Sequence, residues 1–265
     1  HPRHILHGRK CMIITGAKSA VLSGALDDVK AVLNDNNIEF ELYSGVSGNT
    51  NISEIYNIAQ TAKEHNIDYL IGIGGGSVLD AAKAVSVYVT NDIEPMQIFE
   101  EKYENTPLKV VCVPTTAGTG SDTTQYVMLT IDEPHNKHSF SSEMCFPYAT
   151  YLDTRYTMTM PVDVTRNTAV DALCHAIESY LNVQASAFSD TVSLEAIRLI
   201  GKSAVALLSG KFSEEDRENL LVAASSGGMA VAHTGLNLVH LMGHKVTCSK
   251  NISHGRANGA LLVEF

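Results

Sequence analysis

Several side chains in the second half of the sequence have the types and the spacing of metal ligands. Asp171 and His175 stand four positions apart, so in a helix both would project from one face. His240, His244 and His254 follow later in the chain. An Asp-x3-His pair joined by distant histidines is typical of a nitrogen and oxygen site for a divalent transition metal with open positions. The alternative is a hydrogen bond on a helix surface with histidines in a core, and spacing alone leaves both readings open.

A glycine-rich segment, IGIGGGS at residues 71–77, lies at a predicted junction between a strand and a helix. Gly75 and Gly76 would let the backbone approach a ligand closely, and the helix that begins near Ser77 would offer free N–H groups. This pattern predicts a pyrophosphate site. The alternative is a tight turn without a ligand, because the motif is not GxGxxG and it follows the third predicted strand.

A second small-residue loop, PTTAGTGSD at residues 114–122, directly follows another predicted strand. Open α/β sheets bind ligands just beyond the carboxyl ends of their strands, where hydroxyl groups and small residues are common. The alternative is an ordinary polar turn. Two such loops at the same sheet edge support each other.

The elements that would position these loops alternate along the first part of the chain. Short β-branched runs are predicted as strands at residues 10–15, 39–43, 68–73 and 108–113. Helices are predicted between them at residues 20–34, 52–65 and 77–89. Such alternation indicates βαβ units and a parallel sheet with helices on both faces. A hairpin of 125–131 and 137–141, turning at Glu133-Pro134, is predicted as an insertion, and residues 149–153 close the sheet.

The second half of the sequence has a different pattern of predicted elements, because no strand pattern occurs after Pro161. Long helical patterns occupy residues 163–181, 187–208 and 214–232. We therefore predict a Rossmann-like α/β dinucleotide-binding domain over residues 1–160 and an all-α, metal-binding domain over residues 161–265. The chain stops on the apolar run ALLVEF at 260–265, which leads us to expect that the helical domain is truncated.

Composition excludes some classes of partner. The net charge of −10 argues against nucleic acid or an anionic membrane as a partner, and no apolar run reaches transmembrane length. The five scattered cysteines form no CxxC pair, so neither a disulfide framework nor a thiolate zinc site is indicated. A reducing cytoplasm fits this cysteine usage best.

Taken together, the motifs closely resemble the iron-containing (group III) alcohol dehydrogenase family, which shares its fold with glycerol dehydrogenase and dehydroquinate synthase. The matching segments are GGGSVLDAAK at 74–83, PTTAGTGS at 114–121, DALCHAIE at 171–178, and the His240-x3-His244-x9-His254-Gly255 pattern. The chain departs from the family at Ala169, Ser253 and Asp122, where glycine, proline and glutamate are usual. The family is also typically longer at both ends.

The resemblance implies a role for each matching residue. Gly75, Gly76 and Ser77 would hold the pyrophosphate, with Asp80 near the nicotinamide. The positions implied on the adenosine, ribose and phosphate side of the cofactor are Gly16, Ser19, Thr115, Thr116, Thr119 and Lys137. The implied metal ligands are Asp171, His175, His240 and His254, with His244 beside the metal as a catalytic proton relay.

The implied function is a metal-dependent alcohol dehydrogenase or aldehyde reductase that uses Fe²⁺ or Zn²⁺ and a nicotinamide dinucleotide. Alternatives are a zinc-dependent glycerol or polyol dehydrogenase on the same fold, and a truncated relative that binds nucleotide without catalysis. We expect a preference for NADP(H) over NAD(H), because Gly16 stands where relatives that prefer NAD often carry an aspartate. The resemblance also implies a homodimer with small-molecule substrates.

Overall fold

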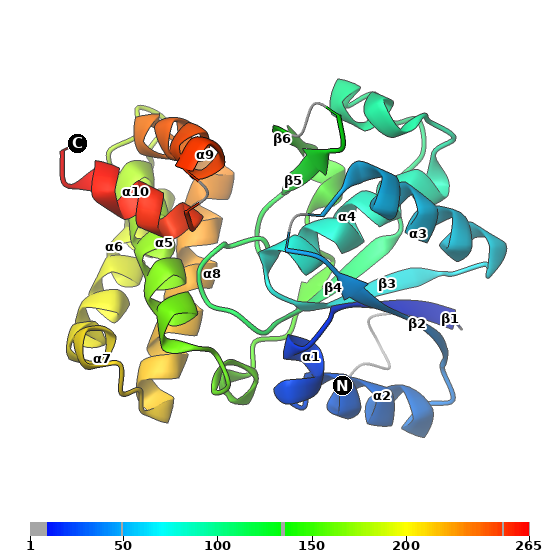
Figure 1. Cartoon of the computed structure of the whole chain (residues 1–265), viewed down its shortest axis with the longest axis horizontal. Coiled ribbons are helices and arrows are strands. Elements are labelled where there is room, and N and C mark those ends of the chain that lie inside the picture. Colours follow the sequence, from blue (N-terminus) through cyan, green and yellow to red (C-terminus); the bar gives the residue numbers. More distant parts are fainter. Residues whose placement is uncertain (1–9, 49, 134–135, 251, 265) are drawn as a thin grey trace. The chain divides into compact units, whose positions relative to one another are not determined.

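The computed structural model describes residues 10–48, 50–133, 136–250 and 252–264 (Figure 1). The chain divides into two compact units. The sheet unit holds the residues up to Thr115 together with Gln125–Tyr151, and the helical unit holds Thr116–Thr124 and the residues from Leu152 onward. Among the described residues, no helix is long and apolar enough to cross a membrane.

The sheet unit is built on five parallel strands in the order β2-β1-β3-β4-β7. Their bounds are β1 Lys10–Gly16, β2 Glu39–Val46, β3 Tyr69–Gly74, β4 Lys109–Pro114 and β7 Ala149–Thr150. The central strand β3 is buried along its whole length, whereas the edge strand β2 is half-buried or exposed up to its last residue, Val46, which is buried. Continuous apolar runs of this kind are typical of strands covered on both faces.

The helices of this unit follow from the right-handed crossovers that parallel strands require. They are α1 (Ser19–Leu22), α2 (Ala25–Asp35), α3 (Ile52–Glu64) and α4 (Gly76–Thr90). The connection from β1 leads to β2 at one edge of the sheet, and the next connection leads back across β1 to β3. The connections that start at β1 and at β2 therefore run in opposite directions across the sheet. As a result, α1 and α2 lie on one face of the sheet, and α3 and α4 lie on the other (Figure 1).

The helix predicted over residues 20–34 is in fact two helices. Gly24 has φ of +81°, a left-handed conformation that interrupts the helix and turns the chain between α1 and α2. The other predicted helices and strands of this unit are present with shifted ends.

The predicted hairpin is confirmed as β5 (Tyr126–Ile131) paired antiparallel with β6 (Asn136–Ser141). Pro134 of the predicted turn lies outside the described residues. The hairpin packs on α4 and on the short 3-10 helices η2 (Pro95–Glu100) and η3 (Glu143–Cys145). One apolar core joins its buried Val127, Leu129 and Phe140 to the sheet and to α3 and α4.

The helical unit begins with the 3-10 turn η4 and continues as α-helices only. Their bounds are η4 Thr154–Thr157, α5 Val162–Tyr180, α6 Ala187–Lys202, α7 Ala204–Ser209, α8 Glu214–Thr234, α9 Leu238–Lys250 and α10 His254–Leu262. The predicted helix 187–208 is interrupted at Ser203, where φ is −91° and ψ is 9°. Sequence patterns did not yield α9 and α10, which carry three of the histidines.

Helices α5, α6 and α8 pack against one another, and α10 packs against α5 and α9. Their shared core is rich in alanine, a small side chain that permits close packing of helices. Serine side chains define two of the helix starts: Ser186 accepts a hydrogen bond from Ser189 N–H, and Ser213 accepts one from Asp216 N–H. A three-helix frame therefore holds α5 in place, and α5 carries Asp171 and His175.

Candidate functional site

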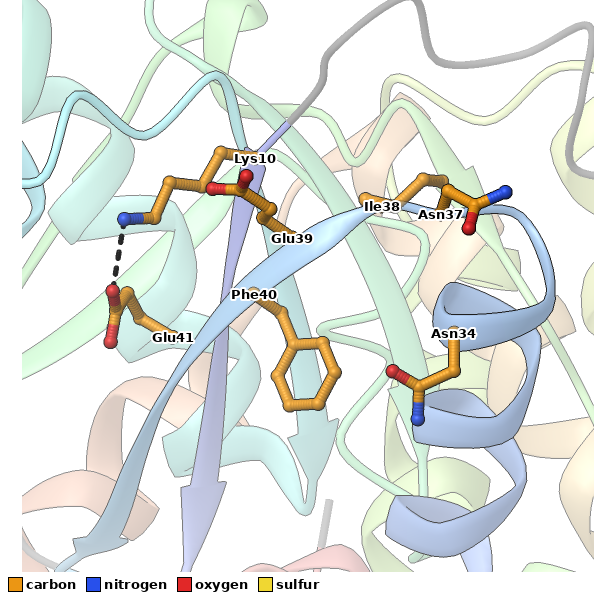
Figure 2. A pocket seen from close by; sticks show the side chains of 7 residues that line it. All are labelled: Lys10, Asn34, Asn37, Ile38, Glu39, Phe40 and Glu41. Atoms are coloured by element: carbon orange, nitrogen blue, oxygen red, sulfur yellow. Dashed lines mark ion pairs between the residues drawn. The ribbon is translucent and has the colours of Figure 1, made fainter.

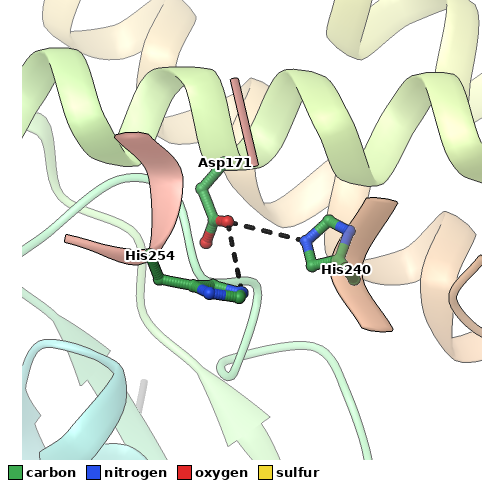
Figure 3. A group of neighbouring side chains, drawn as sticks. All are labelled: Asp171, His240 and His254. Atoms are coloured by element: carbon green, nitrogen blue, oxygen red, sulfur yellow. Dashed lines mark ion pairs between the residues drawn. The ribbon is translucent and has the colours of Figure 1, made fainter. Parts of the chain in front are cut away.

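Three of the predicted metal ligands lie together in the helical unit. Asp171 on α5, His240 on α9 and His254 at the start of α10 each offer one ligand atom, and these atoms lie within 4.8 Å of one another (Figure 3). Asp171 Oδ1 is 3.5 Å from His240 Nε2 and 3.8 Å from His254 Nε2. One carboxylate and two imidazoles form a donor set that suits a divalent transition metal.

A close helix contact brings His254 to Asp171. A Cβ atom added to Gly255 would clash with the carbonyl oxygen of Asn167, which lies one turn before Asp171 on α5. Glycine therefore lets the first turn of α10 touch the backbone of α5 directly. This contact explains why a glycine follows His254 in the motif: any larger residue would collide with α5.

The other two histidines of the motif lie beside this group. His175 is not part of the three-residue group, but its ring stacks on His240 with centroids 4.4 Å apart and planes 12° apart. His244, one turn along α9 from His240, stacks on the His254 ring at 4.3 Å. All five residues of the predicted constellation therefore lie in one neighbourhood of the helical unit.

One ligand atom of this group, His240 Nε2, is buried and has no hydrogen-bond partner among the described residues. Leaving a buried polar atom unpaired typically costs about 1–3 kcal/mol, and a bound ion or water is one way in which proteins avoid that cost. A cation that accepts a lone pair from this nitrogen would remove the penalty. The residues present thus fit a metal ion.

The protonation of the imidazoles is set by burial and by two carboxylates. Burial lowers the pKa of His175 to about 4 and that of His254 to about 4, so both rings are neutral near pH 7 and offer lone pairs. Burial also opposes the charged form of His240, but the nearby carboxylates of Asp171 and Glu178 outweigh it and raise its pKa to about 9. The pKa of Asp171 is held far below its usual range: burial opposes ionisation, and the facing imidazoles of His175 and His240 outweigh it.

Sequence reasoning missed two residues of this neighbourhood, Glu178 and Asn258. Both are fully buried; Glu178 contacts the His240 ring, and Asn258 donates a hydrogen bond to Asp171. A signal was present for each. Glu178 continues the helical stripe of Asp171 and His175 at the spacing i, i+4, i+7, and Asn258 follows His254 by one turn.

The glycine-rich segment and the β1 end lie at the same edge of the sheet unit. Thr15 pairs with Ile73, and Gly74 pairs with Pro114, so the carboxyl ends of β1, β3 and β4 are adjacent. This edge includes the point between β1 and β3 where the strand order reverses, which is where open α/β sheets bind nucleotides. Gly16 ends β1, and Gly75 precedes α4 as its N-cap.

Several predicted cofactor residues at this edge have polar contacts of their own. Ser77 donates from its hydroxyl to Gly48 O at 3.0 Å, and Thr115 donates from its N–H to Gly74 O at 2.8 Å. The Thr115 hydroxyl is buried without a partner among the described residues. Ser19 and Gly76 are the first residues of α1 and α4. The first turn of α4 leaves N–H groups that have no partner within the helix.

Two other predicted residues of the sheet unit are associated with the hairpin: Lys137 is part of it, and Asp80 on α4 contacts it. Asp80 accepts a hydrogen bond from Met128 N–H at 3.0 Å and lies 3.3 Å from the buried ammonium of Lys83. Its carboxylate therefore links α4 to β5. Lys137 is a residue of β6 and pairs with Thr130.

Thr116 and Thr119 belong to the helical unit, where their loop docks on α8. The Thr119 hydroxyl accepts a hydrogen bond from Ser121 N–H at 3.4 Å. Ser225 donates from its hydroxyl to Asp122 at 2.6 Å, and Thr123 donates to Ser225 O at 3.1 Å. The small residues of this loop therefore also serve its packing, a role that the motif did not reveal.

A hollow of about 600 Å³ lies elsewhere on the sheet unit (Figure 2). It is lined by Lys10, Asn34, Asn37, Ile38, Glu39, Phe40 and Glu41. Lys10 and Glu39 begin β1 and β2, so the hollow is at the amino ends of these strands, opposite the glycine-rich edge. Two of the lining residues, Lys10 and Glu41, form an ion pair at 2.9 Å. It is not the predicted nucleotide site.

Comparison with known proteins covers both units. Residues 3–154 match the family described as iron-containing alcohol dehydrogenase, and residues 165–265 match the C-terminal part of the Fe-containing alcohol dehydrogenase family. The chain is 37% identical to the probable alcohol dehydrogenase EutG of Salmonella typhimurium over 212 residues. This match covers 80% of this chain and 54% of EutG. It is 29% identical over 261 residues to the NADPH-dependent butanol dehydrogenase of Clostridium saccharobutylicum, covering 97% of this chain and 67% of that enzyme.

The solved structures agree. An iron-containing alcohol dehydrogenase of Thermotoga maritima superposes with a TM-score of 0.89 at 35% identity, over 96% of this chain and 70% of that one. The chain spans about half the length of EutG and two thirds of the butanol dehydrogenase. On these matches, over both units, the chain belongs to the iron-containing alcohol dehydrogenase family.

Proposed function

We propose that this chain supplies the nucleotide-binding and metal-binding parts of a dehydrogenase that moves a hydride between NAD(P)(H) and a small alcohol or aldehyde. One observation carries the proposal: Asp171, His240 and His254 converge, and a buried His240 nitrogen faces that group without a hydrogen-bond partner among the described residues. Family membership supports the reaction class.

In the proposal, Asp171, His175, His240 and His254 hold a divalent Fe²⁺ or Zn²⁺ ion. When bound, the ion would act as a Lewis acid toward the substrate oxygen, and the nicotinamide would carry the hydride. Asp171 supplies the negative charge that a buried cation requires. Asp171 and His240 are both buried, so water has little access to their ligand atoms.

His244 is the proposed proton relay. Its ring is half-buried and stacks on His254, so it lies beside the ligand group without belonging to it. Imidazole exchanges protons near neutral pH, as a relay to or from a substrate oxygen requires.

The nucleotide is proposed to bind at the glycine-rich edge of the sheet unit, with its pyrophosphate at the start of α4 near Gly75, Gly76 and Ser77. We further propose a preference for NADP(H). Gly16 ends β1, and the sequence at the end of β2 and just beyond it, residues 44–48, is SGVSG. Neither segment carries a carboxylate that would repel a 2′-phosphate. Lys18 is exposed next to Ser19 and would add positive charge.

The test is anaerobic reduction of a short panel of aldehydes with NADPH, using protein reloaded with Fe²⁺ or with Zn²⁺. We expect turnover that a chelator abolishes and that the metal restores. Tight NADPH binding without turnover on any aldehyde or polyol would overturn the proposal and favour a protein that only binds nucleotide. Turnover restricted to polyols with zinc would favour the glycerol dehydrogenase alternative.

A further inference from the structure

Glu178 is a buried carboxylate that sequence motifs did not single out as functional. It lies on α5, one turn beyond His175, and its side chain is 0% exposed. Ionisable groups are rarely buried to this extent unless each oxygen has a partner. The contacts of Glu178 therefore identify what it does.

Both oxygens of Glu178 accept hydrogen bonds from the start of α9. Oε1 accepts from Val239 N–H at 2.9 Å and, more weakly, from His240 N–H at 3.4 Å. Oε2 contacts Nδ1 of the His240 ring. One carboxylate thus holds both the first turn of α9 and the imidazole that this turn carries.

The chemistry of the contact fixes which ring nitrogen faces the ligand group. A carboxylate only accepts hydrogen bonds, so Nδ1 of His240 must carry the proton. The other nitrogen, Nε2, is the atom that lies 3.5 Å from Asp171 Oδ1 and that has no hydrogen-bond partner among the described residues. With a proton held on Nδ1, Nε2 is the nitrogen that can give its lone pair to the proposed metal once its own proton leaves.

We propose that Glu178 is a positioning residue for the metal centre, which locks His240 in the orientation and tautomer that present Nε2 as a ligand. The inference rests on the proposed metal site. A carboxylate bonded to the far nitrogen of a metal-binding histidine orients the ring and increases its basicity, and loss of such a partner typically weakens metal binding by about 10–100-fold.

Glu178→Gln tests this role with almost no change of shape. Glutamine has one accepting oxygen and one donating amide group, so it cannot accept from both the backbone N–H groups and Nδ1–H. If the amide faces the ring, the proton moves to Nε2, and the lone pair that would bind the metal is lost. We expect Zn²⁺ affinity, measured by competition with a chromogenic chelator, to fall by about 10–100-fold.

Asn237→Ala is the matched control. Asn237 donates from Nδ2 to the backbone oxygen of Glu178 at 3.1 Å, so it links the same two chain segments without touching the His240 ring. If Glu178 only supported the start of α9, both variants would weaken Zn²⁺ binding to a similar extent, which would overturn the proposal. We expect Asn237→Ala to stay within about twofold of the unmodified protein, well short of the loss typical of a ligand's partner.

The outcomes separate the two levels of inference. If the unmodified protein binds no Zn²⁺, the proposed metal site is wrong. If it binds Zn²⁺ and Glu178→Gln binds equally well, the site stands and the role of Glu178 is wrong. Nitrogen-15 spectra of the unmodified Zn²⁺-loaded protein give a readout that does not depend on any variant folding: a proton on Nδ1 of His240 supports the proposal, and a proton on Nε2 overturns it.

Discussion

Asn258 donates a hydrogen bond of 2.9 Å from Nδ2 to Asp171 Oδ1, across 87 residues of sequence. The same Nδ2 lies 3.1 Å from Nε2 of His254, which stands one turn earlier on α10. Because Asn258 is fully buried, water does not compete for the Asp171 carboxylate at this contact. One turn of α10 therefore brings a proposed ligand and also restrains the carboxylate of a second one.

Replacing Asn258 by alanine should affect both stability and metal binding. Loss of a buried hydrogen bond to a charged acceptor typically costs about 1–3 kcal/mol, so we expect a decrease of that size in the free energy of unfolding without metal. With Asp171 less restrained, Zn²⁺ affinity should fall by about tenfold or more. Urea unfolding in chelator and a chelator competition measure the two effects.

Asn91→Ala is a suitable control for that variant. Asn91 is also a buried asparagine, and its Nδ2 donates to Val87 O at 3.1 Å and Asn105 O at 3.0 Å in the sheet unit. It should lower stability to a similar extent and leave Zn²⁺ affinity unchanged. Equal loss of affinity in both variants would mean that Asn258 acts only through general stability.

A second prediction concerns the ligand His254. His254→Ala removes one member of the converging group and should lower Zn²⁺ affinity by at least about 100-fold, more than loss of an indirect partner does. His233→Ala is the control. His233 lies in the same unit but contacts Ser186 and Phe188 and not the ligand group. Metal content after dialysis should be near stoichiometric for His233→Ala and far lower for His254→Ala; the same content in both would show that His254 is not a ligand.

Much of the frame could be predicted from local pattern. The strands β1, β3 and β4 appear in the sequence as continuous apolar runs, and the small-residue segments that follow β3 and β4 indicate the edge where their carboxyl ends meet. The pair Asp171 and His175 was recognisable because a four-residue spacing has a fixed meaning in a helix. The iron-containing alcohol dehydrogenase family and the α/β-then-helical fold predicted from these motifs are confirmed.

The rest depends on tertiary contacts that local pattern does not encode. The close contact of α10 with α5 requires that Gly255 has no side chain, and the sequence does not say which backbone a glycine meets. Glu178 resembles an ordinary helix residue until its partner on α9 is known. The break at Gly24 had a local signal, but the apolar pattern on both sides outweighed it in the prediction.

Metal binding should release a proton at neutral pH. Burial lowers the pKa of His240, but the carboxylates of Asp171 and Glu178 beside the ring outweigh it and raise that pKa to about 9, so in the absence of metal the ring carries protons on both nitrogens below that pH. A metal must displace the proton on Nε2, so log affinity should rise by about one for each pH unit and level off near pH 9. His175 and His254, with pKa values of about 4, are already neutral and add no proton at pH 7.

Titration calorimetry in buffers with different ionisation enthalpies measures that release. We expect about one proton for each Zn²⁺ bound at pH 7. The absence of any buffer dependence, together with an affinity that does not change between pH 6 and 8, would show that His240 is neutral before the metal binds.

The last prediction concerns cofactor choice, and the structure shows that position 16 accepts a side chain. A Cβ atom at Gly16 would lie 3.4 Å from Val78 Cγ2 and 3.7 Å from Val46 O, which are ordinary contacts, and the φ of Gly16 is not positive. Gly16→Asp therefore adds a carboxylate at the end of β1 without forcing the backbone.

If the 2′-phosphate of NADPH binds there, repulsion should lower kcat/KM for NADPH relative to NADH by about tenfold or more, since charge-assisted contacts are worth roughly 1.5–3 kcal/mol. Gly16→Ala adds a small side chain without charge, so it should leave the NADPH-to-NADH ratio of kcat/KM nearly unchanged. The ratio of the two binding affinities, measured by nucleotide fluorescence, should also stay nearly unchanged in this variant. A ratio that Gly16→Asp does not move, or that Gly16→Ala moves equally, would show that the ribose is recognised elsewhere.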